Sequence, residues 1–296
     1  MEQTYWENPH GAWLFVKASL LSGSFKQFDW KNPTLLGNLS FLELFTITSN
    51  NFEGNIPESI GHLKGLSFFA IGDNKLNGHN NLVGSVSTNL GYLLDLQFLS
   101  LTDNKLGRAL DFLMSLRNCS KLVVLSLEIN QFEGVLPNSI GNLSTQLNAL
   151  YLGQNQISGM IPAALHNLIN LISLGMEENL FTGVIPTYFA KFQKMQGLFL
   201  LGNKFSGQIP SSIGNLTQLA YLDFSQNNLE GSLPPSIGNC QSLQILDVSQ
   251  NYLSGVIPQQ MAVPKRLAQV VDPMLLPREV EELGVATAVM MATEKR

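Results

Sequence analysis

Acidic and aromatic side chains recur at fixed positions along most of this 296-residue chain. The positions lie six, four, two and one residues before a series of nearly evenly spaced asparagines. The aromatic members are Phe68, Phe98, Tyr151, Phe199 and Tyr221, and the acidic members are Asp73, Asp103, Glu128, Glu177, Glu178, Asp223 and Asp247. Exposed aromatics anchor interfaces well, and acids beside them favour a basic or amine-bearing partner. Alternatively, such residues only keep a solvent-facing surface soluble. For this reason we expect a binding role for the array as a whole more than for any single residue in it.

Nucleophiles, bases and metal ligands form no comparable pattern. The four histidines fall at unrelated positions, and surface locations are expected for His62 and His166. Cys119 and Cys240 each lie eleven residues before one of the asparagines, five repeats apart, where leucine stands elsewhere. At about 4.7–4.9 Å per strand step they would be about 24 Å apart, beyond the roughly 7 Å reach of a disulfide. We therefore predict buried thiols and no catalytic residue, metal site or cofactor.

The asparagines set the period of the chain. Successive members are 24, 30, 26 and 25 residues apart and then 24 residues apart four times. A period in the twenties built on leucine and asparagine is typical of a leucine-rich-repeat solenoid. The nine asparagines are Asn50, Asn74, Asn104, Asn130, Asn155, Asn179, Asn203, Asn227 and Asn251.

The stretch Leu216–Pro234 shows why this spacing gives a stacked fold. Leu222 and Phe224 are two apart, so a strand points both to one face, whereas Tyr221, Asp223 and Ser225 point to solvent. No single repeat can bury its apolar side chains alone, so neighbours must stack. The asparagine amide can satisfy backbone groups where the strand ends. Gly231 and Pro234, which follow, suit a turn and a short helical segment. We expect a concave parallel sheet and convex 3-10 or irregular segments.

Three phrases carry a family resemblance: NKFSGQIPSSIGNLTQLAYLDFSQN, NNLEGSLPPSIGNCQSLQILDVSQNYLSGVIP and GVLPNSIGNLSTQLNALYLGQNQISGMIP. The first two resemble the plant-specific leucine-rich repeat, with its Leu-x-Gly-x-Ile-Pro ending. The third resembles ectodomains of plant leucine-rich-repeat receptor-like serine/threonine kinases, in the branch of the immune receptors. The resemblance implies an α/β-type superhelix of about nine repeats. It also implies a peptide or protein ligand and, as a second partner, a co-receptor.

We predict three segments: a non-repeat start at residues 1–32, a repeat domain at 33–260, and a non-repeat tail at 261–296. Two stretches depart from the period, around Asn80 and in GRALDFLMSLRNCSKL, and we expect the six extra residues after Asn74 to loop out on the convex side. The tail phrase PKRLAQVVDPMLL resembles a piece of the kinase C-lobe of the same receptors. The glycine-rich loop, catalytic lysine, His-Arg-Asp and Asp-Phe-Gly motifs of kinases are absent from the chain, so we predict no enzyme activity.

Composition and charge exclude some classes of binding partner. The net charge of −5 argues against nucleic acid, and no apolar run is long enough to span a membrane. Lys17 interrupts the apolar stretch Ala12–Leu21, so no signal peptide is recognised and the chain is expected to stay inside the cell. The family instead occupies the cell surface, which leaves the compartment open. In a secreted protein, four sequons would carry glycans, at Asn38, Asn118, Asn142 and Asn215.

The sequence thus predicts a non-enzymatic recognition module whose concave sheet docks a peptide or a partner receptor. Its candidate binding residues are Phe68, Phe98, Glu128, Tyr151, Glu177, Phe199, Tyr221, Asp223 and Asp247. One alternative is a truncated or misjoined product of a receptor-kinase gene, without a function of its own. Another is a leucine-rich-repeat inhibitor of a microbial wall-degrading enzyme, which would need a signal peptide and paired-cysteine caps.

Overall fold

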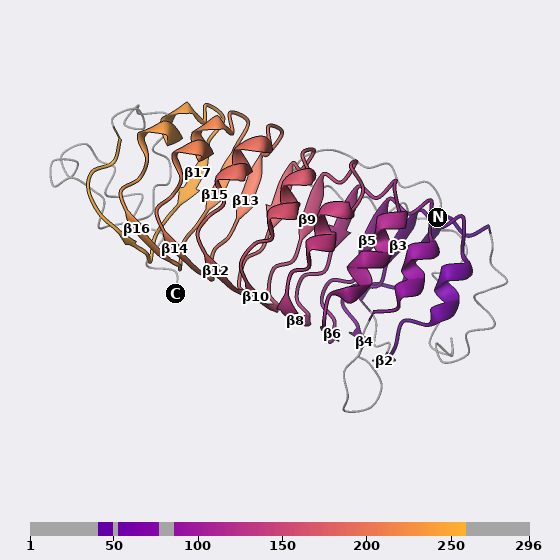
Figure 1. Cartoon of the computed structure of the whole chain (residues 1–296). Coiled ribbons are helices and arrows are strands. Elements are labelled where there is room, and N and C mark those ends of the chain that lie inside the picture. The colour runs from indigo at the N-terminus through magenta and orange to yellow at the C-terminus, as the bar shows by residue number, and fades with distance from the viewer. Residues whose placement is uncertain (1–40, 50–52, 77–85, 259–296) are drawn as a thin grey trace.

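The computed structural model describes residues 41–49, 53–76 and 86–258, and the predicted end segments and residues 77–85 lie outside them. Successive repeats stand side by side along one axis, with 3-10 helices on one side of the stack (Figure 1). Within the described residues, one strand from each repeat joins a nine-stranded parallel sheet. Its strands are β1 (Leu44–Thr46), β3 (Phe68–Ala70), β5 (Phe98–Ser100), β7 (Val124–Ser126), β9 (Ala149–Tyr151), β11 (Ser173–Gly175), β13 (Gly197–Phe199), β15 (Tyr221–Asp223) and β17 (Ile245–Asp247).

The predicted convex helical segments are present as a row of short 3-10 helices. A proline precedes most of them in extended conformation, as the Ile-Pro phrase predicts. The irregular stretch before Asn130 contributes the longest of these helices, which stands in the row like the others. The helices are η2 (Glu58–His62), η3 (Thr88–Tyr92), η4 (Asp111–Asn118), η5 (Asn138–Asn142), η6 (Ala163–Asn167), η7 (Thr187–Lys191), η8 (Ser211–Asn215) and η9 (Pro235–Asn239).

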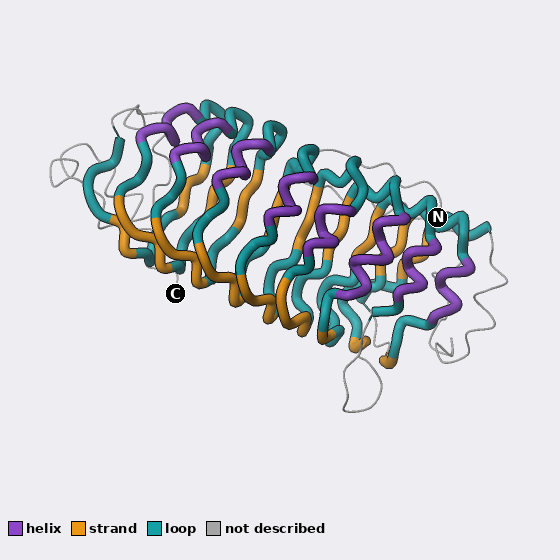
Figure 2. Tube along the Cα trace, in the orientation of Figure 1, coloured by secondary structure: helices purple, strands orange, loops and turns teal. Residues whose placement is uncertain are grey.

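A second parallel sheet follows the asparagines, and the sequence did not predict it. Its short strands form another edge of the stack, visible as the lower orange row in Figure 2. It is seven-stranded in the described part of the chain, and β2 (Glu53–Gly54) pairs with β4 (Lys75–Leu76) separately. The seven strands are β6 (Gly107–Arg108), β8 (Gln131–Val135), β10 (Gln156–Gly159), β12 (Leu180–Gly183), β14 (Lys204–Gly207), β16 (Asn228–Gly231) and β18 (Tyr252–Leu253).

The predicted role of the asparagines is confirmed. Asn227 is buried, and its Nδ2 is 3.0–3.2 Å from the carbonyl oxygens of Leu200, Phe224 and Ser225. Its Oδ1 accepts the backbone N–H of Phe205, in the preceding repeat, at 3.0 Å. The amide therefore closes the turn of its own repeat and fastens it to the repeat before. The same arrangement recurs at Asn104, Asn130, Asn155, Asn179, Asn203 and Asn251.

The core follows the predicted inward positions, with one correction. Leu222 and Phe224 are fully buried, and Leu222 lies in register with the core leucines of the two neighbouring strands. Gly231 has φ +80°, the left-handed region that favours glycine. Ser225, however, is buried rather than solvent-facing, because its hydroxyl donates to Oδ1 of Asp223 at 2.7 Å. Ser225 is therefore covered at a position where alternation predicts an exposed side chain, although the next residue, Gln226, is exposed.

Candidate ligand-binding face

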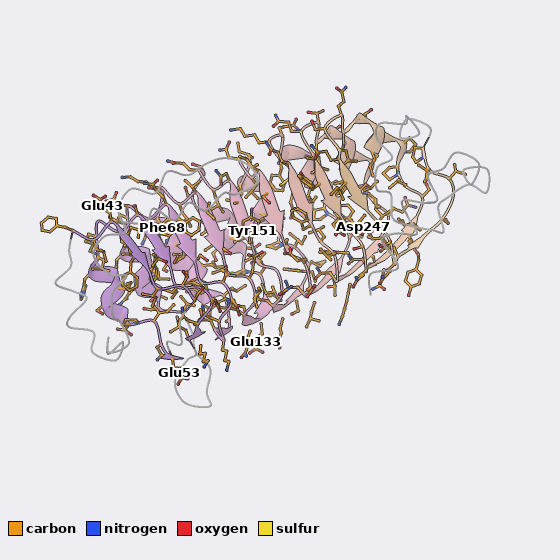
Figure 3. The ribbon with its side chains drawn as sticks, turned by 180° about the vertical axis from the view of Figure 1, so that it is seen from behind. Glu43, Glu53, Phe68, Glu133, Tyr151 and Asp247 are labelled. Carbon is orange, nitrogen blue, oxygen red and sulfur yellow. The ribbon has the colours of Figure 1, made fainter. Side chains whose placement is uncertain are left out.

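The nine candidate residues all belong to the outward side of the nine-stranded sheet, which we call the concave face. Each is half-buried. Figure 3 views the molecule from this side and labels Phe68, Tyr151 and Asp247 along it. The residues divide into an N-terminal group (Phe68, Phe98, Glu128), a central group (Tyr151, Glu177, Phe199) and a C-terminal group (Tyr221, Asp223, Asp247).

In the N-terminal group, two aromatic rings pack on each other. Phe68 and Phe98 stand opposite one another on β3 and β5, with ring centroids 4.3 Å apart and planes 6° from parallel. Stacking fixes both rings against each other. These two residues therefore form one apolar platform rather than two separate anchors.

Beside this platform runs a chain of hydroxyl groups that the sequence interpretation did not single out. Ser100 Oγ donates to Thr102 Oγ1 at 3.1 Å, and Thr102 Oγ1 is 2.6 Å from Ser126 Oγ. Ser126 in turn donates to Oε2 of Glu128 at 3.1 Å. Burial raises the pKa of Glu128, and the bond from Ser126 opposes that rise. Small hydroxyl residues at two of the outward positions were the available sequence signal.

The central group is built on glycines. A Cβ placed on Gly153 would lie 2.5 Å from Cδ of Glu177, and one on Gly175 would lie 2.9 Å from its Oε2 and 3.1 Å from Cδ1 of Tyr151. Similarly, Cε2 of Phe199 lies 2.8 Å from the Cβ position of Gly197. The larger side chains can lie flat on the sheet only because glycines leave the backbone bare. The sequence interpretation missed these glycines.

The C-terminal group presents two aspartates held by their own strands. Oδ1 of Asp223 accepts from both the backbone and the hydroxyl of Ser225, and Oδ1 of Asp247 accepts from the backbone of Ser249 at 2.9 Å. Tyr221 donates its hydroxyl to Oε1 of Gln244 at 3.2 Å. Burial raises the pKa of Asp223, against the effect of its bonds from Ser225. Each carboxylate is therefore fixed in direction by a local turn.

The charge of the concave face has one sign. Its four outward positions in the nine repeats carry seven carboxylates and no lysine, arginine or histidine. The salt bridge found among the described residues, between Lys121 and Asp95, is exposed, and neither residue lies at one of the outward positions. A cation approaching the sheet therefore meets uncompensated negative charge.

In the part of the chain that the structure describes, the other reactive side chains form no site. Cys119 and Cys240 are unpaired and buried, as predicted, and burial raises the pKa of each to about 11. Within the described ranges, no three histidine, cysteine or acidic side chains are grouped to hold a metal ion. No helix there has the length and apolar character needed to cross a membrane. Asn118, Asn142 and Asn215 are exposed at helix ends, whereas Asn38 lies outside the described residues.

Comparison with known proteins agrees with the repeat architecture. The Leucine Rich Repeat family matches residues 121–143, 146–168, 194–216, 218–240 and 242–262. The chain is 47% identical over 68 residues to the LRR receptor-like serine/threonine-protein kinase EFR of Arabidopsis thaliana. These 68 residues are 23% of this chain and 7% of that protein. The matched segment is thus a small part of the relative.

Solved structures extend the likeness over most of the repeats. One is the LRR ectodomain of the membrane receptor kinase GASSHO1/SCHENGEN3 from Arabidopsis thaliana, in complex with CASPARIAN STRIP INTEGRITY FACTOR 2. It is 33% identical with a TM-score of 0.73, covering 78% of this chain and 27% of that one. Another is the ectodomain of the Arabidopsis receptor kinase HAESA with a peptide hormone ligand. It is 30% identical with a TM-score of 0.70, and the match covers 79% of this chain and 38% of that one.

The stacked parallel strands, the buried asparagine ladder and these matches define the chain as a leucine-rich-repeat solenoid. More narrowly, its repeats are similar to those of plant leucine-rich-repeat receptor-like kinases, in the form found in ectodomains. The resemblance of residues 261–296 to a kinase C-lobe remains a prediction.

Proposed function

We propose that the chain recognises a peptide or protein ligand on its concave face, without catalysis. The observation that carries the proposal is the concave face itself, where aromatic rings and seven carboxylates stand on a hydrogen-bonded sheet with no basic residue. Half-buried aromatics on a rigid support lose little entropy on binding, so they are suitable interface anchors. Two receptor ectodomains of the same architecture were solved with bound ligands, one of them a peptide hormone.

A binding selection on the full chain tests this proposal. Peptides are selected from a displayed library of random 12-residue sequences, and their affinity is measured for the chain and for Tyr151→Ala. Loss of a central aromatic anchor typically costs about 2 kcal/mol or more, so we expect binding to weaken by about tenfold or more. The matched control is Tyr252→Ala, since Tyr252 is exposed on β18 in the other sheet. Failure to recover any binding peptide, or equal losses in both variants, would contradict the proposal.

Non-enzymatic action is the second element of the proposal. It is supported by the match of the repeats to ectodomains and by thiols that burial keeps protonated. Purified chain incubated with labelled ATP and a general kinase substrate should transfer no phosphate above a buffer control. Clear transfer would overturn this element. The proposal also includes a co-receptor as a second partner. It further includes a repeat domain that begins at residue 33 and ends at residue 260.

Neither alternative gains support. The matches are to receptor ectodomains, and no observation on the described residues favours an inhibitor of a wall-degrading enzyme or a product without function. The proposal therefore stays with ligand recognition.

A further inference from the structure

The strongest local feature of the concave face is the position of the Glu177 carboxyl group. Glu177 follows β11 by two residues, and its side chain lies over Gly153 of the neighbouring repeat and Gly175 of its own strand. A Cβ on either glycine would come within 3.0 Å of the carboxyl group. The carboxylate is thus held low against the sheet instead of extending into solvent.

Two aromatic side chains flank this carboxylate. Gly175 stands in register with Tyr151 on one side and with Phe199 on the other. With neighbouring strands about 4.8 Å apart, the two aromatic residues are about 9.6 Å apart along the sheet. Gly175 lies between them, under Cδ1 of Tyr151 and Oε2 of Glu177. Neither ring stacks on another ring in the part of the chain that the structure describes. A cation bound at the Glu177 carboxyl group would therefore have an aromatic residue on both sides.

The carboxylate itself lacks a counter-charge. Its Oε2 is buried and has no hydrogen-bond partner among the described residues. Burial, and then the negative charges of Glu128, Glu178 and Asp223, raise the pKa of Glu177 to about 6, against the effect of a hydrogen bond from its own backbone. Buried polar atoms are nearly always hydrogen-bonded, so an orphan carboxylate oxygen calls for an explanation. A cation bound against this carboxyl group would supply the missing charge.

We propose that Glu177, flanked by Tyr151 and Phe199 over the glycine floor, is the subsite for one arginine side chain of a peptide ligand. The inference rests on the proposed function and names the chemistry of its ligand. Arginine fits better than lysine because its flat guanidinium group stacks on aromatic rings and offers paired donors to a carboxylate. Glu128 and Asp223 add attraction from either side without a base to cancel it.

The test uses an arginine-containing 12-residue peptide recovered in the selection above and its citrulline analogue, which keeps the shape and loses the charge. The full chain is compared with Glu177→Gln. The matched control is Glu133→Gln, because Glu133 is exposed on β8, away from the concave face (Figure 3). We expect either change, citrulline or Glu177→Gln, to weaken binding about tenfold or more, and both together to weaken it little further. Glu133→Gln should stay within about twofold.

Other outcomes separate this inference from the proposed function. Selected peptides without arginine, or equal binding by Glu177→Gln and the wild-type chain, overturn the arginine subsite. If those peptides still lose affinity with Tyr151→Ala, ligand recognition on the concave face stands. A lysine preference that depends on Glu177 overturns the choice of arginine. Thermal melting confirms that each variant is folded, and Glu177→Asp, which retains the charge but shortens the reach, replaces Glu177→Gln if the latter does not fold.

Discussion

The carboxyl group of Glu177 lies on the backbone of Gly153, with its Cδ 2.5 Å from the place a Cβ of residue 153 would occupy. Gly153→Ala should therefore displace a flexible side chain rather than the backbone. We expect the free energy of unfolding to change by less than about 0.5 kcal/mol. The pKa of Glu177 should fall from about 6 towards its ordinary value, because the displaced carboxylate regains water. Carbon-13 NMR titration of the glutamate side chains measures this, and an unchanged pKa would contradict the described packing.

Gly91 in η3 should respond differently to the same substitution. Its Cβ position lies 2.5 Å from the backbone oxygen of Ser115 in the next 3-10 helix and 2.9 Å from the carbonyl carbon. The backbone cannot move aside as a side chain can, so Gly91→Ala must separate two stacked repeats. Such overpacking typically costs about 1–3 kcal/mol. Urea denaturation measures the loss, and Gly153→Ala is the control. A stability equal to that of the control would show that the helices are less closely packed.

The asparagine ladder gives the largest predicted change in stability. Asn179 accepts the backbone N–H of Ile157 at 2.9 Å and donates to the carbonyl oxygen of Leu152 at 2.9 Å. Asn179→Ala leaves these buried backbone groups unpaired, which should lower the free energy of unfolding by about 2–4 kcal/mol. Asn228→Ala, at an exposed position beside the ladder, should have little effect. Comparable unfolding midpoints for the two variants would argue against the ladder as the main link between repeats.

The parts of the fold that could be predicted are those fixed by residue type at a constant interval. Asn227 and Leu222 identify the strand end and the core position in each repeat, and both lie where the period places them. The second sheet was missed because strands such as β16 follow the asparagine at once and contain few residues. So short a run cannot be distinguished from a turn by alternation alone.

The candidate face was predicted as a set of positions, whereas its internal contacts were not. Alternation places Tyr151 and Glu177 on one side of the sheet, but it does not show that Glu177 lies over Gly153. In a sequence, a glycine at an outward position is only a position without a side chain, although in the structure it is the floor on which a neighbour's side chain lies. Likewise, the burial of Ser225 depends on a side-chain bond to Asp223 that no periodicity indicates.

The acids of the concave face should make stability depend on pH. Burial raises the pKa of Glu177 from 4.5 to about 6 in the folded state and also raises those of Glu128 and Asp223. A group with a raised pKa binds its proton more tightly in the folded protein. Its contribution to stability is therefore complete below its ordinary pKa and is lost as pH rises through the folded value.

We thus expect the melting temperature to fall, through these groups, as pH is raised from about 4.5 to about 7. Glu177→Gln removes the group whose pKa is raised to about 6, so its melting temperature should fall less over the same range. Glu133→Gln, which alters an exposed carboxylate on β8, should follow the wild-type curve. An arginine-containing ligand would reverse the trend, because it binds the ionised carboxylate and its affinity rises with pH through about 6. Parallel melting curves for Glu177→Gln and the wild-type chain would show that Glu177 titrates at its ordinary pKa, against the burial described for its carboxyl group.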